Sequence, residues 1–258
     1  MGISYCLWQF YFMFFINFKT YESGTGAKGL EMAKIVEKVS RESGIEMAVV
    51  VQAVDVRMIA EAVLVPVWCQ HVDAMEYGAH TGWVLPEAVK EAGAVGVLLN
   101  HSEHKVLGIQ NPKFEIRNPK QIQNSKFKIQ NEGSLFGNLN KTVDRCREVG
   151  LKTLVCAAGV EEFEEVLKAD SDYVAYEPPE LIGSREQSVS TAKPEVVQKV
   201  VEIAGQTPVL IGAGIHAAED IRVGLELGAS GFLISSDVML ADDPEEELQK
   251  LMKGYNSQ

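Results

Sequence analysis

The sequence has few cysteines, no metal-ligand spacing and no excess of basic residues. Its four cysteines, Cys6, Cys69, Cys146 and Cys156, include no Cys-x-x-Cys pair, so neither a disulfide framework nor a zinc motif is indicated. The five histidines contain no His-x-x-x-His spacing, and we expect no bound metal. The net charge of −12 argues against nucleic acid as a partner, because phosphate backbones bind basic surfaces. Unpaired cysteines are typical of a cytosolic protein, in which we expect Cys69 and Cys156 to lie in the core.

The chain also lacks an apolar run long enough for a membrane span, which needs roughly 20 residues. The apolar N-terminus, residues 1–16, is shorter than that and has neither the basic start nor the small-residue cleavage site of a signal peptide. We therefore expect no membrane partner. The second half of this stretch is typical of a buried strand that begins near Met13. We interpret residues 1–12 as an atypical extension or as the product of a misassigned start codon.

Short runs rich in valine, isoleucine and leucine alternate with amphipathic segments, as expected for parallel strands buried on both faces and connected by helices. The predicted strands cover residues 12–17, 46–51, 66–70, 95–99, 152–156, 172–176, 208–211 and 230–234. The predicted helices cover residues 27–43, 54–62, 85–92, 138–149, 160–168, 194–204, 217–227 and 243–253. Pro86 and Pro194 fit first-turn positions, and Ser190 or Thr191 is a candidate cap for the sixth helix. This pattern predicts a single α/β domain, residues 1–258, with a (β/α)8 barrel fold, although an open doubly wound sheet fits the same alternation.

One polar stretch interrupts the alternation between the fourth strand and the fourth helix. Residues 109–131 form a degenerate repeat with a period of six to seven, in which Pro112 and Pro119 exclude a heptad helix. A loop of this length within a compact domain is either functional or disordered. We predict that residues 108–136 are a repetitive, poorly ordered insertion; a binding loop for an acidic partner is the alternative.

Chemically active side chains follow the ends of three predicted strands. Lys19 can offer a cation to an anionic substrate, His101 can polarise a carbonyl or move protons, and Glu177, held by two prolines, can act as a base. Glu103 can pair with Lys19 and hold it in place. In isolation these residues have plainer interpretations, namely a surface lysine, a core histidine and surface carboxylates. Because strand ends share one face of a barrel, we expect them to meet in one active site.

Small residues follow the last two strands, at Gly212 to Gly214 and at Ser235 and Ser236. Barrel enzymes often hold a phosphate group at this place, on backbone amides that glycine allows to approach closely. Glycine also simply makes turns, so each tract alone is weak evidence. Two such tracts in consecutive units predict a phosphate-binding site.

Six stretches of the sequence occur together in one known family. They are Asn17 to Tyr21, Gln70 to Asp73, Gly78 to Gly82, Leu85 to Ala94, Asn100 to His104 and Glu177 to Gly183. In their order and spacing they resemble triosephosphate isomerase in its shorter archaeal form, from about Phe14 to Leu251 apart from residues 108–136. The resemblance implies a TIM barrel that interconverts dihydroxyacetone phosphate and D-glyceraldehyde 3-phosphate, in glycolysis and gluconeogenesis, without metal or cofactor.

The resemblance also implies roles for individual residues. Glu177 abstracts the carbon-bound proton, and a neutral His101 polarises the carbonyl as the electrophile, which are the roles known from this family. Lys19 stabilises the negative charge of the enediolate and the phosphate, and Asn17 orients the substrate. The positions that match the family's phosphate-binding residues are Ile182, Gly183, Gly214, Ser235 and Ser236. Residues 78–82 match a protruding loop that docks into a neighbouring subunit, so a homo-oligomer, tetramer or dimer, is implied.

Two departures from the family pattern bear on activity. The lid after Glu177 usually continues with a Gly-Thr-Gly tip and a proline, whereas here Gly183 is followed by Ser-Arg-Glu-Gln-Ser, about one residue longer and without the second glycine. A poorer lid is expected to lower turnover or to release a side product. The insertion begins shortly after His101 and Glu103. A catalytically impaired phosphate-binding barrel is therefore one alternative to an active isomerase. A different barrel enzyme for a phosphorylated substrate is another, against which the combination of Asn17, Lys19, His101 and Glu177 argues.

Overall fold

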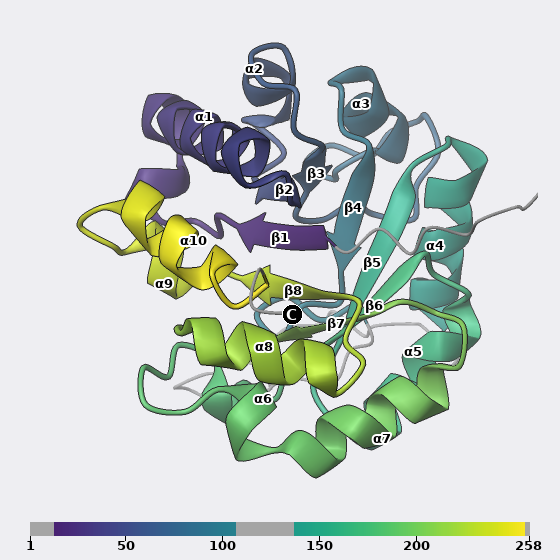
Figure 1. The fold of residues 1–258 in the computed structure, drawn as a ribbon. Helices are drawn as coiled ribbons and strands as arrows, with labels where there is room; N and C mark the ends of the chain where they lie inside the picture. The colour runs from purple at the N-terminus through teal and green to yellow at the C-terminus, as the bar shows by residue number, and fades with distance from the viewer. Residues whose placement is uncertain (1–12, 107–136, 256–258) are drawn as a thin grey trace, which may run out of the picture.

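Eight strands pair in sequence order to close a parallel barrel, and helices pack around it (Figure 1). The structure, a computed structural model, describes residues 13–106 and 137–255. The strands are β1 (Met13–Asn17), β2 (Glu46–Val51), β3 (Val67–Cys69), β4 (Gly96–Leu99), β5 (Lys152–Ala157), β6 (Tyr173–Tyr176), β7 (Val209–Gly212) and β8 (Gly231–Ile234). Because β1 pairs with both β2 and β8, the sheet has no free edge. The predicted TIM barrel is confirmed, and the open doubly wound sheet was the wrong alternative.

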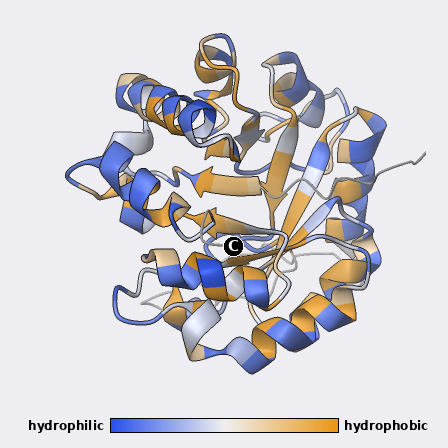
Figure 2. Ribbon diagram, in the orientation of Figure 1, coloured by the Kyte–Doolittle hydropathy of each residue, from blue (hydrophilic) through white to orange (hydrophobic). Residues whose placement is uncertain are grey.

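Successive residues of each strand point alternately into the barrel and toward the helices, which buries both faces. On β1, Phe15 belongs to the interior cluster, while Phe14 and Ile16 pack in the layer between strands and helices. The buried members of the interior cluster are Phe15, Ala48, Val50, Trp68, Leu98, Leu154, Cys156, Ala175, Leu210 and Leu233. This double burial is why the strands are almost uniformly hydrophobic, whereas the helices carry hydrophilic residues along much of their length (Figure 2).

Helices follow the strands as predicted, with two short additions. They are α1 (Gly26–Ser43), α2 (Val56–Ala60), α3 (Pro86–Glu91), α4 (Gly137–Glu148), α5 (Val160–Val166), α6 (Val189–Ala192), α7 (Pro194–Ala204), α8 (Ala218–Glu226), α9 (Ser236–Met239) and α10 (Pro244–Met252). Single 3-10 turns cover Glu22–Gly24, Leu167–Ala169 and Pro179–Leu181. The sequence did not predict α6 and α9, because four residues are too few to show a helical period.

Two of the predicted helix starts are confirmed and one predicted cap is wrong. Pro86 and Pro194 occupy the first turns of α3 and α7. Ser190 and Thr191 do not cap α7 but lie inside α6, whose cap is Ser188: its side chain accepts a hydrogen bond from the backbone N–H of Thr191. The helices are separate because a residue before proline, here Lys193, is pushed out of the helical region.

The predicted insertion and N-terminal extension lie outside the described residues. The chain leaves the described part after Val106, beyond β4, and returns at Gly137, the first residue of α4. The interruption thus falls between the fourth strand and the fourth helix, as predicted; the predicted poor order of residues 108–136 and the nature of residues 1–12 stay predictions. Within the described residues, no helix is long and apolar enough to cross a membrane. Cys69 and Cys156 are buried free thiols, as expected, and so is Cys146.

Candidate active site

The alternating register of the strands places a set of polar or small residues at the carboxyl end of the barrel. Each of them comes two residues after a member of the interior cluster, so it lies on the same, inward-facing side of its strand, at the barrel mouth. These residues are Asn17, Gln70, Glu177, Gly212 and Ser235. The predicted convergence of groups at the strand ends therefore follows from the two-residue period of the strands.

Lys19 is held over the mouth by contacts from three elements. Its Nζ lies 2.8 Å from Oε1 of Glu103, the predicted ion pair, and its side chain is only 13% exposed. Its backbone has a left-handed φ of 47°, which a lysine rarely adopts. The side chain of Asn17 accepts the Lys19 N–H at 3.0 Å, and Nε2 of Gln70 donates to the Lys19 carbonyl at 2.8 Å. Gln70 was missed as a site residue, although it too follows a buried strand.

His101 reaches the mouth because the chain turns sharply before it. Asn100, the first residue after β4, has a left-handed φ of 58°, a conformation that asparagine tolerates better than most residues. Nδ1 of His101 lies 3.3 Å from the backbone nitrogen of Glu103 and accepts its N–H. A ring nitrogen that accepts cannot carry a proton, so this contact favours the tautomer with its proton on Nε2, although Oε2 of Glu103 also lies 3.5 Å from Nδ1. That Nε2 lies 3.4 Å from Oε2 of Glu177.

Glu177, the first residue after β6, carries a buried carboxylate next to His101, and only 6% of the residue is exposed. Its backbone N–H donates to the carbonyl of Ala157 on β5 at 2.9 Å, and Pro178 follows directly. Oε2 has no hydrogen-bond partner among the described residues, so the oxygen facing His101 is available to a ligand. Burial raises the pKa of the Cys156 thiol well above its ordinary value, and the nearby Glu177 carboxylate adds to the rise. Cys156 is therefore a neutral packing partner of Glu177.

The predicted phosphate-binding residues surround one small cavity of about 30 Å³ that also contacts Lys19 and Glu177. Its predicted lining residues are Asn17, Ile182, Gly183, Gly214, Ser235 and Ser236, all brought together from four separate strand ends. Oγ of Ser235 donates to the carbonyl of Asn17 at 2.7 Å, which ties the last strand to the first. The structure thus places every predicted site residue at the same end of the barrel.

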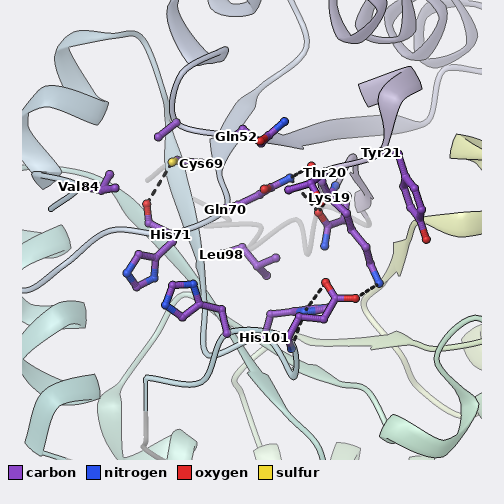
Figure 3. Close-up of a pocket in the computed structure, with 14 residues that line it drawn as sticks. Lys19, Thr20, Tyr21, Gln52, Cys69, Gln70, His71, Val84, Leu98 and His101 are labelled. Carbon is purple, nitrogen blue, oxygen red and sulfur yellow. Dashed lines mark hydrogen bonds and ion pairs between the residues drawn. The ribbon is translucent and has the colours of Figure 1, made fainter. Parts of the chain in front are cut away.

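A larger cavity of about 600 Å³ opens on the other side of Lys19 and His101. Figure 3 shows both side chains reaching it from different elements, with Gln70 beside Lys19 and His71 farther from it. The rings of His71 and His104 stack here with centroids 4.3 Å apart. Burial is the main cause that lowers the pKa of His71; the hydrogen bond to Asp73 opposes this shift, and the neighbouring His104 adds to it. This second cavity has no counterpart in the sequence prediction.

The lid after Glu177 is anchored at its far end. Oγ of Ser188 donates to Oδ1 of the buried Asp220 at 2.5 Å, and the other oxygen of Asp220 accepts the N–H groups of His216 and Ala217 at 3.0 and 2.9 Å. Gly214 packs so closely against the lid that a Cβ at this position would lie only 2.1 Å from the carbonyl oxygen of Gln187. The lid end and the loop after β7 are therefore packed as one unit.

No cluster of three or more histidine, cysteine, aspartate or glutamate side chains suited to a metal ion occurs within residues 13–106 and 137–255. The chemistry available at the mouth is that of a carboxylate, an imidazole and an ammonium group. A base, a hydrogen-bond donor and a cation together can move a proton between neighbouring carbons of an anionic substrate.

Comparison with known proteins relates nearly the whole chain to one family. The family model described as Triosephosphate isomerase matches residues 12–254. A triosephosphate isomerase of Methanocaldococcus jannaschii is 40% identical over 242 residues, which are 92% of this chain and 97% of the relative. One from Methanobacterium bryantii is 39% identical, with 92% of this chain and 94% of the relative covered. The crystal structure of triosephosphate isomerase from Bartonella henselae has a TM-score of 0.64 at 16% identity, covering 96% of this chain and 100% of that chain, and shows the shared fold.

Proposed function

The chain belongs to the triosephosphate isomerase family, and we propose that Glu177, His101 and Lys19 carry out its reaction. The activity is the interconversion of dihydroxyacetone phosphate and D-glyceraldehyde 3-phosphate. One observation carries the assignment of roles: Oε2 of Glu177 lacks a hydrogen-bond partner within the described residues and lies 3.4 Å from Nε2 of His101. A base and a hydrogen-bond donor this close can act on adjacent atoms of one small substrate.

In this proposal Glu177 removes a proton from C1 of dihydroxyacetone phosphate. The C1–H electron pair forms the C1–C2 double bond, and the C2 carbonyl oxygen becomes the enediolate oxygen. His101, neutral and protonated at Nε2, donates a hydrogen bond to that oxygen, and the Lys19 ammonium stabilises its negative charge. Protonation at C2 by the carboxylic acid of Glu177, with the hydroxyl proton of C1 transferred to the C2 oxygen, gives D-glyceraldehyde 3-phosphate.

The small cavity is proposed to hold the phosphate group. It lies between the lid residues Ile182 and Gly183 and the tracts at Gly214 and Ser235, with Lys19 at its edge. Backbone amides and one cation are a suitable set for a phosphate dianion. The lid would then enclose the enediolate and hold its phosphate group, whose elimination from an unenclosed enediolate is the competing side reaction.

We further propose a homo-oligomer in which the loop between β3 and α3 enters the larger cavity of a second copy. Tyr77 and Trp83 on this loop are 77% and 56% exposed, which is a large apolar surface to leave in water. The cavity beside Lys19 is about 600 Å³, enough for side chains of a second copy. Light scattering of the purified protein, compared with a Tyr77→Ser, Trp83→Ser variant, tests this: a monomer in both cases would contradict it.

We propose that residues 1–258 form a single barrel domain in which residues 1–12 and 108–136 are additions not needed for folding. We also propose a cytosolic location, which is supported by the free thiols of Cys69, Cys146 and Cys156 in the described residues.

The proposed roles are tested by a coupled assay with glyceraldehyde 3-phosphate and glycerol-3-phosphate dehydrogenase. Glu177→Gln is expected to lower kcat by about 1,000-fold, because the amide cannot accept the carbon-bound proton. Binding of 2-phosphoglycolate should be retained, since the phosphate cavity is intact. Glu180→Gln is the matched control, because this lid carboxylate pairs with Lys193 at an exposed site. Full activity of Glu177→Gln would remove Glu177 from the mechanism, and inhibitor binding by a wild-type protein without turnover would instead support an impaired barrel.

A further inference from the structure

The active-site loop after β4 closes on itself before the described chain ends at Val106. Oδ1 of Asn100 accepts the backbone N–H of Val106 at 3.1 Å, which ties the first residue of the loop to its last. Within this closed loop, the backbone N–H of His104 donates to the backbone carbonyl of His101 at 2.9 Å. His101 and Glu103 thus lie on a short, internally bonded loop.

A buried carboxylate on α5 holds both ends of this loop. Oε1 of Glu162 accepts from Nζ of Lys105 at 2.7 Å and from Nδ2 of Asn100 at 2.8 Å, and Oε2 accepts the N–H of Ala158 at 2.9 Å. The side chains of Lys105 and Glu162 are only 8% and 11% exposed. A buried ion pair is tolerated when, as here, hydrogen bonds satisfy its oxygens.

The same contacts connect the loop to the base. Nδ2 of Asn100 also donates to the carbonyl of Cys156 on β5 at 2.8 Å. The next carbonyl on that strand, that of Ala157, accepts the N–H of Glu177 at 2.9 Å. Two consecutive carbonyl groups of β5 therefore position the loop that carries His101 and the backbone of Glu177. The 3.4 Å separation between the imidazole and the carboxylate depends on both contacts.

We propose that Asn100, Lys105 and Glu162 form a clamp that fixes His101 relative to Glu177, independently of the chain that follows Val106. The proposal rests on the roles proposed above for His101 and Glu177. The clamp residues line neither the larger nor the smaller cavity, so they are positioning residues and do not touch the substrate. All contacts of the clamp lie within the described residues, on the loop after β4, on β5 and on α5.

The clamp is tested by steady-state kinetics of Lys105→Met in the full-length protein. Loss of the ammonium group frees one end of the loop, so kcat should fall by about tenfold or more, since a displacement of 1 Å can cost about 100-fold in rate. KM should change little, because the phosphate cavity is formed by other strand ends. Lys105→Arg, which keeps the charge, should restore most of kcat. Lys168→Met is the matched control, because Lys168 makes an exposed pair with Glu165 beside the same helix.

A second readout separates positioning from simple stabilisation. In 15N NMR spectra the wild-type His101 ring is expected to be neutral and protonated at Nε2, and Lys105→Met should shift this signal toward a mixture of tautomers. If Lys105→Met fails to fold, the double variant Lys105→Met, Glu162→Gln is measured in its place, because it leaves no unpaired buried charge. Lower thermal stability with unchanged kcat and an unchanged His101 signal would overturn the clamp. Failure of the proposed function is distinguishable: either the wild type shows no turnover, or Glu177→Gln retains it, and the His101 signal still reports on the clamp in both cases.

Discussion

Gly212 packs directly against the carboxylate of Glu177. A Cβ added at Gly212 would lie 2.7 Å from Oε1 of Glu177 and 2.8 Å from the carbonyl oxygen of Leu233, both closer than real Cβ contacts. The end of β7 therefore provides space for the proposed base, and the tract that the sequence assigned only to phosphate binding also shapes the position of Glu177.

Gly212→Ala is expected to push the Glu177 carboxylate away from the barrel mouth. We predict that kcat falls by about tenfold or more, because proton abstraction is sensitive to small displacements of the base. Steady-state kinetics measure this. Gly159→Ala is the control, since a Cβ at Gly159 meets no atom within 4 Å. Equal kcat values for Gly212→Ala and the wild type would show that the carboxylate can move aside without cost.

Lys19→Met is expected to affect catalysis more than Glu103→Gln. The first change removes the only cation that contacts both described cavities, and kcat/KM should fall by about 100-fold. The second removes a partner that is 40% exposed but leaves the ammonium group, so a smaller effect is expected. Lys28→Met, which breaks an exposed pair with Glu22, is the control for loss of a lysine. A larger loss in Glu103→Gln than in Lys19→Met would contradict the assigned roles.

Deletion of residues 109–135 is expected to leave the barrel folded and active. Val106 and α4 are each held by contacts within the described residues, and closing a shorter loop costs less chain entropy. Circular dichroism and thermal unfolding test folding, with a change in Tm of no more than about 4 °C expected. Insoluble protein, or folded protein that has lost turnover, would show that the segment is part of the working enzyme.

Changing the lid tip toward the family pattern is expected to improve retention of the intermediate. The variant Ser184→Thr, Arg185→Gly introduces the second glycine, and we predict that release of inorganic phosphate per isomerisation falls by about twofold or more. Phosphate release and isomerisation are measured in parallel on the same sample. Glu186→Gln, a change in the same exposed segment without a new glycine, is the control. Unchanged phosphate release would mean that the lid already retains the intermediate well.

The stability of the protein should decline as the pH falls through the ordinary pKa of histidine. Burial is the main cause that lowers the pKa of His71 below its usual value of 6.5, so the unfolded chain binds this proton before the folded one does. A histidine is charged only when protonated. If folding lowers its pKa, the folded protein loses stability as the pH falls below the pKa that the histidine has in the unfolded chain. His104 stacks on His71 and opposes its protonation, whereas Asp73, 3.1 Å away, favours it.

We therefore predict that His71→Gln reduces the loss of stability between about pH 7.5 and about pH 5.5, measured by urea unfolding. His80→Gln, which changes an exposed histidine of the same loop, should leave the loss unchanged. The same slope in both variants would show that other groups cause the acid sensitivity.

The candidate site was largely predictable because its residues stand at the ends of apolar runs. Glu177, His101 and Lys19 each follow a buried strand, and a parallel barrel brings all strand ends to one face. Gln70 follows a strand in the same way, yet its importance depends on a contact with the Lys19 carbonyl that no sequence pattern reveals. The cap at Ser188 was missed for a related reason, since a four-residue helix leaves no periodic signal.

The sequence by itself determined the order of strands and helices and which side chains reach the barrel mouth, because the two-residue period of a strand and the 3.6-residue period of a helix are local properties of the backbone. Only the tertiary structure decided the distances between these side chains. The contact of His101 with Glu177 and the clamp of Asn100, Lys105 and Glu162 join residues on elements far apart in the chain. Such long-range contacts form only when the barrel closes.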